Sequence, residues 1–319
     1  MKERIALNPM QQSYLRGREA KYGRFSKACF VYEYDPTKVE HARLVEALQR
    51  LPQLHPLLGA GLDGETLVLG AGRLELQEAP LWTEGIEAQA ETLFQQFTWN
   101  EQCLSQVTLV TGSHAYVALC INGILADGLS HDRILETLER CYEGEPLEPV
   151  ECSQAFLDYM ETLRAEQRTP EQAQALEESM RQFPPAAELA IAEEFYTPDP
   201  QETGVCRQPI AASLWQAFQQ KAAGQGVTAF PVLLTLVGKA IGQYTDRSKV
   251  VLNVPRTARI VPIDGIFQAV GMYSDFSLVP VEAAESDVFA QAKSLSISLM
   301  EQQFQPDLRP GSAESLEKE

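Results

Sequence analysis

The segment NGILADG (Asn122–Gly128) holds the residues whose types and spacing come closest to an acid–base site. Asp127 carries a carboxylate, which can exchange a proton or hold a charged partner in place. Asn122 can only donate and accept hydrogen bonds, because an amide does not titrate. Gly123 has no side chain, so it can neither take a proton nor orient a substrate. The segment therefore predicts hydrogen-bond positioning more readily than proton transfer.

Two other groups of residues invite a catalytic interpretation. Ser130, His131 and Asp132 spell a catalytic triad in order, but adjacent residues cannot meet in the geometry that a triad needs. Ser130 is better interpreted as the N-cap of the following helix. His55, in the apolar segment LHPLLGA, offers a base, although a histidine in such a place more often has a structural role.

Hydrophobic periodicity predicts the elements that position these residues. YVALCI (Tyr116–Ile121) reads as a strand that runs into NGILADG, and a helix over Ser130–Tyr142 follows. Farther upstream the pattern predicts an amphipathic helix that begins at Val39 and ends at Pro52. Both halves of the chain mix helices and strands without strict βαβ alternation, which favours an α+β fold.

The order of elements predicts two subdomains joined by a proline-rich linker. We expect an N-terminal subdomain over residues 1–182 and a linker, FPPAAELAIAEEFYTPDPQETG, over residues 183–204. The second subdomain covers residues 205–305 and begins with a strand over Val205–Ala211. The polar tail, residues 306–319, is predicted to be disordered.

Composition narrows the class of protein. The net charge is −18 at pH 7, from 44 Asp and Glu against 26 Lys and Arg, which argues against nucleic-acid binding. No apolar run reaches the roughly 20 residues that span a bilayer, and MKERIALNPM lacks the apolar core of a signal peptide. We therefore expect a cytoplasmic protein without a membrane partner. The six cysteines have no metal-ligand spacing, which predicts reduced, packed thiols and no metal site.

The ordered series of motifs resembles the heterocyclization domains of nonribosomal peptide synthetases, a branch of the condensation-domain superfamily. LNPMQQSYLRGREAKYG (Leu7–Gly23) resembles the family's opening, and LHPLLGA resembles its Arg-His-Pro-x-Leu-Arg-Ala segment. NGILADG falls on the active-site motif, and Arg259 on the arginine of an Asn-Arg pair. VGMYSDFSLVPV resembles the Val-Gly-Asp-Phe-Thr-Ser stretch. The resemblance covers nearly all of residues 5–305 in the right order.

The resemblance implies two chloramphenicol-acetyltransferase-like α/β sandwich subdomains in a V arrangement, the second incomplete. Substrates would arrive as thioesters on the phosphopantetheine arms of peptidyl or aryl carrier proteins, with neighbouring synthetase domains as partners and no cofactor bound directly. The family joins an acyl donor to Cys, Ser or Thr and then dehydrates the product, in siderophore-type pathways among others. The resemblance implies these candidate substrate or tunnel residues: Gly123, Gly128, His55, Arg259, Tyr273 and Ser274.

This sequence departs from the family pattern at the motif itself. Asn122 and Gly123 stand where the condensation branch has two histidines, and Asn122 and Asp127 where the heterocyclization branch has two aspartates. The arginine that the resemblance pairs with Asp127 is Gly59 here, which predicts a buried carboxylate without its cation. The resemblance also implies a further C-terminal stretch, with a crossover between subdomains and residues for cyclodehydration, that this sequence does not include.

Three hypotheses follow from this combination. The first is a heterocyclization-like domain that has lost catalysis and binds carrier proteins or partner synthetase domains. The second is an active condensation or heterocyclization enzyme, in which Asn122 and Asp127 orient a Cys, Ser or Thr nucleophile and proximity supplies most of the rate. The third is a non-enzymatic acidic interaction protein that has kept the fold.

Overall fold

The computed structural model describes residues 3–19, 27–80, 86–112, 114–165 and 208–304, with residues 169–171, 174, 177–178, 181 and 183–184. By its internal contacts the chain divides into two units, Met1–Ala165 with Thr257–Ser274, and Glu166–Arg256 with Asp275–Glu319. The predicted division differs from these units at two points. Thr257–Ser274 lies within the predicted second subdomain but belongs to the first unit, and the second unit begins at Glu166, within the predicted N-terminal subdomain. Most of the predicted linker, residues 185–204, and the tail fall outside the described residues.

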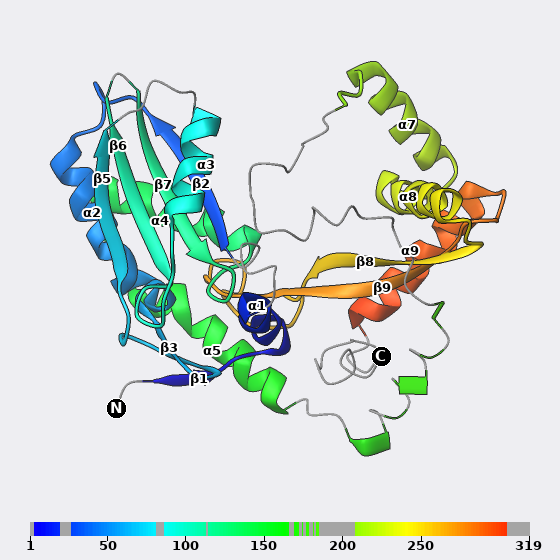
Figure 1. Ribbon diagram of the computed structural model, residues 1–319, viewed down its shortest axis with the longest axis horizontal. Coiled ribbons are helices and arrows are strands. Elements are labelled where there is room, and N and C mark those ends of the chain that lie inside the picture. Colours follow the sequence, from blue (N-terminus) through cyan, green and yellow to red (C-terminus); the bar gives the residue numbers. More distant parts are fainter. Residues whose placement is uncertain are drawn as a thin grey trace. The chain divides into compact units, whose positions relative to one another are not determined.

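A four-stranded mixed sheet forms the centre of the first unit (Figure 1). Neighbouring strands are antiparallel except for the parallel pair β5 and β6. The strand order is β2 (Lys27–Tyr34), β7 (Ala115–Asn122), β6 (Ser105–Thr111), β5 (Leu74–Pro80). β7, which the sequence predicts as a strand, is buried along its whole length, as its apolar composition requires of a strand covered on both faces.

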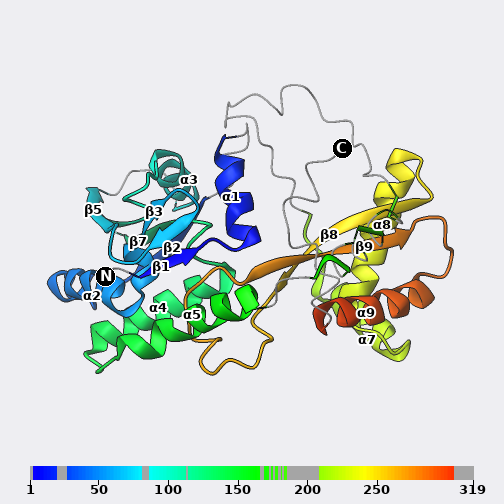
Figure 2. The ribbon, with the colours of Figure 1, turned by 90° about the horizontal axis from the view of Figure 1, so that it is seen from below.

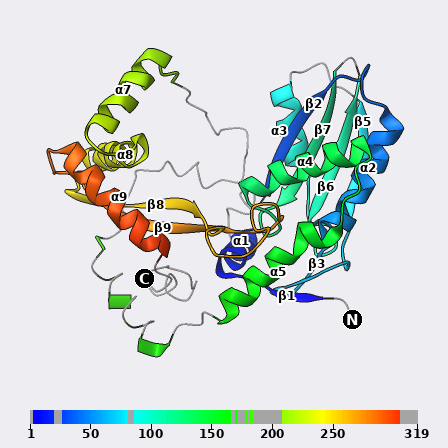
Figure 3. The same ribbon diagram turned by 180° about the vertical axis from the view of Figure 1, so that it is seen from behind.

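Helices cover both faces of this sheet. Helix α3 (Ile86–Gln96) lies on one face, and α2 (His41–Leu54) and α4 (Gly128–Glu143) lie on the other (Figures 1 and 3). Successive side chains of β7 point alternately to the two faces of the sheet. Tyr116 and Ala118 pack with Leu93 of α3. The residues between and after them pack on the other face, in the main core with α2 and α4: Val117, Leu119, Ile121.

Helix α2 passes through Pro52 and ends at Leu54, so the predicted end at Pro52 is wrong. Leu51 and Leu54 are both buried, and their burial sustains the last turn after the proline. The backbone N–H of His55 closes the helix by donating to Leu51 O at 2.7 Å. Tertiary packing has here outweighed the local preference of proline to stop a helix.

Smaller elements complete the first unit. A three-stranded antiparallel sheet has the order β1-β4-β3, and Gly64, with φ of +58°, makes the turn between β3 and β4. The strands are β1 (Arg4–Ala6), β3 (Gly61–Asp63) and β4 (Thr66–Val68). The remaining helices are α1 (Pro9–Glu19), the short 3₁₀ helix η2 (Pro56–Gly59) and α5 (Pro149–Ala165).

Over residues 208–304 of the second unit, helices pack with a pair of strands. β8 (Lys249–Thr257) and β9 (Ser274–Glu282) run side by side (Figures 1 and 2), and the helices are α7 (Ala212–Gly224), α8 (Ala229–Thr245) and α9 (Val288–Phe304). Gly238 lets α8 approach β9 closely, because a Cβ at this position would lie 2.6 Å from Val281 Cβ. Of the predicted strand Val205–Ala211, residues 205–207 lie outside the described residues, and residues 208–211 are not in a strand.

The mixture of helices and sheets confirms the predicted α+β class. Among the described helices, none is by itself long and apolar enough to cross a membrane. Helices α7 and α8 meet that length and composition only when taken together, and they are bent by 103° at their junction.

Candidate functional site

The candidate site is the loop between β7 and α4, which the sequence NGILADG forms. Asn122 is the last residue of β7, and Asp127 is the N-cap of α4, with its Oδ1 accepting from the backbone N–H of Ser130 at 2.9 Å. The predicted N-cap at Ser130 is therefore wrong, because the carboxylate earlier in the loop already caps the helix. Ser130 lies inside the first turn and is free to use its hydroxyl elsewhere.

Asp127 has a cation, contrary to the sequence prediction. Arg259 donates from Nη2 to Asp127 Oδ1 at 2.9 Å and from Nε to Oδ2 at 3.2 Å, in a two-pronged pair. The prediction failed because it looked for the arginine at Gly59, whereas the guanidinium arrives from the segment Thr257–Ser274. The pair is buried, since the side chains of Arg259 and Asp127 are 0% and 5% exposed. Burial of a charge on this scale requires such pairing.

The other donors of Arg259 are also satisfied. Nη1 donates to the carbonyl oxygens of Ile266 and Ala269, the second at 2.8 Å. The guanidinium carbon lies 3.9 Å from the ring centroid of Tyr273, a cation–π contact that also fixes its plane. Arg259 is thus held from three directions by groups of this chain.

The Ser130 hydroxyl joins this network to the loop at Gly271. It accepts from Arg259 Nη2 at 2.9 Å and from the backbone N–H of Gly271 at 3.1 Å. Its own proton faces two acceptors, Asp127 Oδ1 at 2.6 Å and Gly271 O at 2.9 Å, and can serve only one at a time. The backbone N–H of Asp127 also donates to Gly271 O at 3.0 Å. Both chain segments are therefore tied together by side-chain and backbone bonds.

The other end of the loop has a different character. Asn122 has no exposed surface, and its Oδ1 accepts from the backbone N–H of Ile124 at 2.9 Å, which fixes the orientation of the amide. Its Nδ2 has no partner among the described residues. At Gly123, a Cβ would lie 3.0 Å from Cε1 of Tyr14, so the tyrosine ring occupies the space that a side chain here would need.

Helix α1 places Tyr14 beside Gly123, and a capping box fixes the start of this helix. Asn8 Oδ1 accepts from the backbone N–H of Gln11 at 2.8 Å, and Gln11 Oε1 accepts from the backbone N–H of Asn8 at 2.9 Å. Gln11 is fully buried, and its Nε2 donates to Ile124 O at 2.6 Å. The start of α1 is thereby fastened to the middle of the candidate site. The pattern N-x-x-Q ahead of a helix is the sequence signal that would have predicted this cap.

His131 is a buried base that the sequence interpretation considered only as part of an apparent triad. Its Nδ1 lies 2.9 Å from Asp127 O, so Nδ1 carries the proton and Nε2 has the lone pair. Nε2 is buried without a partner among the described residues, and the ring lies against Phe30 with centroids 3.6 Å apart. Burial lowers the pKa of His131, which outweighs the opposite effect of its hydrogen bond to Asp127. The imidazole is therefore neutral near pH 7.

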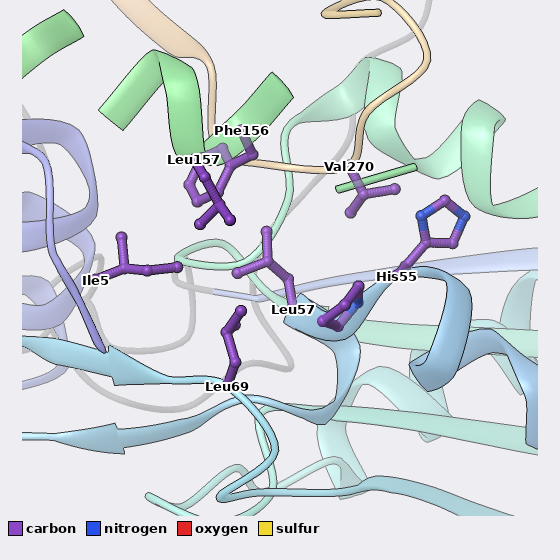
Figure 4. Close-up of a pocket in the computed structure, with 8 residues that line it drawn as sticks. Ile5, His55, Leu57, Leu69, Phe156, Leu157 and Val270 are labelled. Carbon is purple, nitrogen blue, oxygen red and sulfur yellow. The ribbon is translucent and has the colours of Figure 1, made fainter. Parts of the chain in front are cut away.

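His55 lies apart from the Asp127 network. It is buried, and its Nε2 lies 2.8 Å from Thr137 Oγ1. Because the threonine hydroxyl donates to Arg133 O at 2.8 Å, it accepts from His55 Nε2. His55 also borders a small pocket lined mostly by apolar side chains, where its ring lies to one side near Val270 (Figure 4). The pocket encloses only about 10 Å³, which is too little for a substrate.

The remaining predicted residues fall in three settings. Tyr273 is fully buried against Phe156 and Arg259, and burial raises the pKa of its phenol. Ser274 is the first residue of β9. Gly128 begins α4, and a Cβ placed there would meet nothing within 4 Å. Among the described residues, no group of three His, Cys, Asp or Glu side chains is arranged to hold a metal ion.

The chain belongs to the condensation-domain family, whose model matches residues 26–303. The predicted superfamily is thus confirmed. Among curated proteins, pyochelin synthetase PchF of Pseudomonas aeruginosa is 24% identical over 318 residues. That alignment covers 91% of this chain but 17% of the synthetase, so the chain spans about a sixth of its relative's length.

Solved structures share the fold at low identity. The cyclization-docking bidomain of EpoB from Sorangium cellulosum matches with a TM-score of 0.73 and 19% identity, over 98% of this chain and 66% of that one. The condensation domain from the monacolin K polyketide synthase MokA matches with a TM-score of 0.73 and 13% identity, over 96% and 75% of the two chains.

Proposed function

We propose that this chain is a heterocyclization-like domain of nonribosomal peptide biosynthesis that binds carrier proteins or partner synthetase domains without forming the product bond. The observation that carries the proposal is the division of the candidate site into two halves. The structural half, Asp127 with Arg259 and Ser130, is complete. The half that would face the reacting groups, Asn122 with Gly123, has no side chain that titrates.

Asp127 is not available as a base. Its Oδ1 accepts from the Ser130 backbone and from Arg259, and its Oδ2 accepts from Arg259. Taking a proton would disrupt a buried ion pair, which is among the most costly changes to a protein interior. The carboxylate therefore holds the loop rather than reacting.

The residue that fills the space beside Gly123 does not supply the base that this position lacks. The ring of Tyr14 occupies the space beside Gly123, and a phenolic hydroxyl is a weak proton acceptor compared with an imidazole. The neutral His131 belongs to α4, and Phe30 of β2 lies against its ring. These arrangements support a domain that still binds its partner domains but no longer catalyses bond formation.

We infer the binding partners of this chain from its family. Condensation domains work on thioesters carried by phosphopantetheine arms, and one curated relative is named as a pyochelin synthetase. The EpoB neighbour, named as a cyclization-docking bidomain, supports the heterocyclization branch and an association with neighbouring domains. We therefore assign carrier proteins of a siderophore-type pathway as the partner class.

One observation favours catalysis as a second candidate. Asn122 Nδ2 is a buried donor with no partner among the described residues, and such a group costs free energy unless a substrate or water accepts from it. In an active domain, Asn122 would donate to the carbonyl of the acyl donor while proximity supplied the rate. This is the active-enzyme hypothesis with Asn122 as the positioning group and Asp127 as its support.

The deciding experiment offers the purified chain a panel of carrier proteins, each in its apo form and in its acyl-loaded phosphopantetheinyl form. Binding is followed by calorimetry, and the carriers are then analysed by intact mass in the presence of free cysteine and of a cysteine-loaded carrier. We expect selective binding of at least one loaded carrier and no amide or thiazoline product.

Two other outcomes reverse the conclusion. Product that disappears in Asn122→Ala, while binding persists, would establish the active-enzyme hypothesis. Failure to bind any carrier, apo or loaded, would leave the third hypothesis, an acidic interaction protein with the condensation fold. Gly128→Ala is the matched control, because it changes the exposed first residue of α4, where a Cβ meets nothing within 4 Å.

A further inference from the structure

Two cysteines face each other across the first unit's sheet. Cys29 of β2 is directly opposite Cys120 of β7 in an antiparallel register. The backbone N–H of Asn122 donates to Leu104 O, so Asn122 and Cys120 turn their backbone groups toward β6. On the β2 side, Cys29 and Cys120 are therefore a non-hydrogen-bonded pair, the type in which side chains lie closest, with Cα atoms about 4.5 Å apart. That separation is within the range that a disulfide spans.

The two thiols lie on the same face of the sheet and touch. Cys120 Sγ lies 4.0 Å from Leu93 O of α3, and Cys29 packs with the cluster around Leu93. A hydrogen bond between the thiols is the main cause that raises the pKa of Cys120, ahead of burial. Both cysteines are free thiols in the structure. Cys120 is buried, whereas Cys29 is only half-buried and is the one that a small reagent can reach.

A cation accompanies the pair. Lys27 is on the same face of β2, where its Nζ donates to the carbonyl oxygens of Phe94 and Phe97, the second at 2.7 Å. Burial lowers the pKa of Lys27, while the neighbouring Cys120 and Cys29 raise it, so the amine lies close to both thiols. An adjacent ammonium stabilises a thiolate and thereby makes a cysteine reactive.

The other described cysteines lack this arrangement. Cys103 is buried and its Sγ donates to Glu75 Oε2 at 3.3 Å, and burial raises the pKa of its thiol to about 11. Cys141 is buried on α4, and burial likewise raises its pKa. Within the described part of the chain, one pair of cysteines shares a rung of a β ladder.

We propose that Cys29 and Cys120 form a redox-sensitive dithiol that hydrogen peroxide converts to an intrachain disulfide. The Cys29 thiolate attacks one peroxide oxygen, which breaks the O–O bond and leaves a sulfenic acid, and the departing hydroxide takes up a proton to become water. The Cys120 sulfur then attacks the Cys29 sulfur, which forms the S–S bond and breaks the S–O bond, and the hydroxyl group leaves with the Cys120 proton as a second water. The two thiols give up two electrons and the peroxide accepts them.

The bridge would act on the candidate site. Cys120 lies on the strand that ends at Asn122, so a covalent tie to β2 fixes the end of β7 where the loop begins. Oxidation would therefore stiffen the Asn122 half of the site and leave the Asp127 network untouched. This inference does not depend on the proposed function.

The test treats the whole chain with hydrogen peroxide, then denatures and alkylates it with N-ethylmaleimide before intact-mass and peptide analysis. We expect two of the six thiols to escape alkylation, one cross-linked peptide pair that joins positions 29 and 120, and full reversal by dithiothreitol. The Cys29→Ser variant should lose the cross-link, and Cys120→Ser should accumulate a dimedone-reactive sulfenic acid at Cys29. Cys141→Ser is the matched control and should still form the bridge.

The mapping of the unaltered protein decides the matter even if a serine variant does not fold. A cross-link that joins other cysteines would overturn the proposal. So would six alkylated thiols at a peroxide dose that fully oxidises free cysteine in the same buffer.

Discussion

The two ends of the loop between β7 and α4 show opposite ways of treating a buried polar group. At the Asp127 end, the carboxylate, guanidinium and hydroxyl bond to one another and to the backbone of a distant segment. At the Asn122 end, an amide nitrogen is left without a partner among the described residues, and an aromatic ring fills the space beside a glycine.

The difference shows which end of the loop the fold depends on. Removing one member of the Asp127 network would leave an uncompensated charge in the core, so the fold depends on that end. The Asn122 end supports little besides its own turn, through the bond to Ile124. A chain can therefore change that end and keep its fold.

The largest effect should come from Arg259→Met. It leaves the Asp127 carboxylate and two carbonyl oxygens buried without their donor, and breaking such a pair costs about 3–5 kcal/mol of unfolding free energy. Urea unfolding followed by circular dichroism measures it. The control is Arg4→Met, whose pair with Asp63 is 54% and 67% exposed and should cost about 1 kcal/mol or less. An Arg259 loss no larger than the Arg4 loss would contradict the comparison.

The next largest loss of stability should come from a side chain added at Gly123, beside the Tyr14 ring. Gly123→His places a Cβ 3.0 Å from the Tyr14 ring and should cost about 1–3 kcal/mol by overpacking. In a Tyr14→Ala background the same change should cost less, because the ring that it meets has gone. A double-mutant cycle on thermal unfolding measures the coupling. Additive effects of the two substitutions would show that the ring and position 123 do not compete for space.

A third prediction compares one residue from each end of the loop. Ser130→Ala removes a hydroxyl that contacts Arg259, Asp127 and Gly271 and should cost about 2 kcal/mol. Asn122→Ala loses one bond, to Ile124, while it also removes an unpartnered donor, so it should cost about 1 kcal/mol or less. Chemical denaturation of both variants gives the ranking, and the reverse order would contradict it.

The smallest effect is the contribution of His131 to the pH dependence of the unfolding free energy. Burial lowers its pKa in the folded protein, so the unfolded chain binds more protons and stability falls as pH drops below the unfolded pKa of about 6.5. Above that pH the contribution is fully present. Thermal melts from about pH 7.5 to 5.5 should show a steeper loss for the native protein than for His131→Leu. Parallel curves would exclude His131 as the source.

Much of the scaffold could be predicted from the sequence. The apolar run Tyr116–Ile121 and the helical spacing after Asp127 gave the strand and helix on either side of the site, because both signals are local. Helix ends were less accurate at Pro52 and Ser130, where burial of leucines and an earlier cap decided the boundary. The ordered motifs predicted the family that the comparison then confirmed.

The partner of Asp127 could not be predicted in this way. No local pattern near Arg259 indicates that its segment packs with the first unit, and the pairing joins residues separated by 132 positions. Nor does the periodicity of α1 show that Tyr14 lies beside Gly123. Both contacts depend on where distant segments pack, which hydrophobic patterns leave open.

The position of Arg259 has a consequence for the order in which the molecule assembles. Synthesis proceeds from the N-terminus and domains tend to fold as they emerge, but the first unit includes Thr257–Ser274, which follows most of the second unit in the chain. Until that segment leaves the ribosome, the Asp127 carboxylate has no counterion, and water must continue to reach the start of α4. Packing of the first unit therefore cannot be completed before Thr257–Ser274 has been synthesised, and in a nascent fragment that stops before Arg259 the start of α4 stays hydrated.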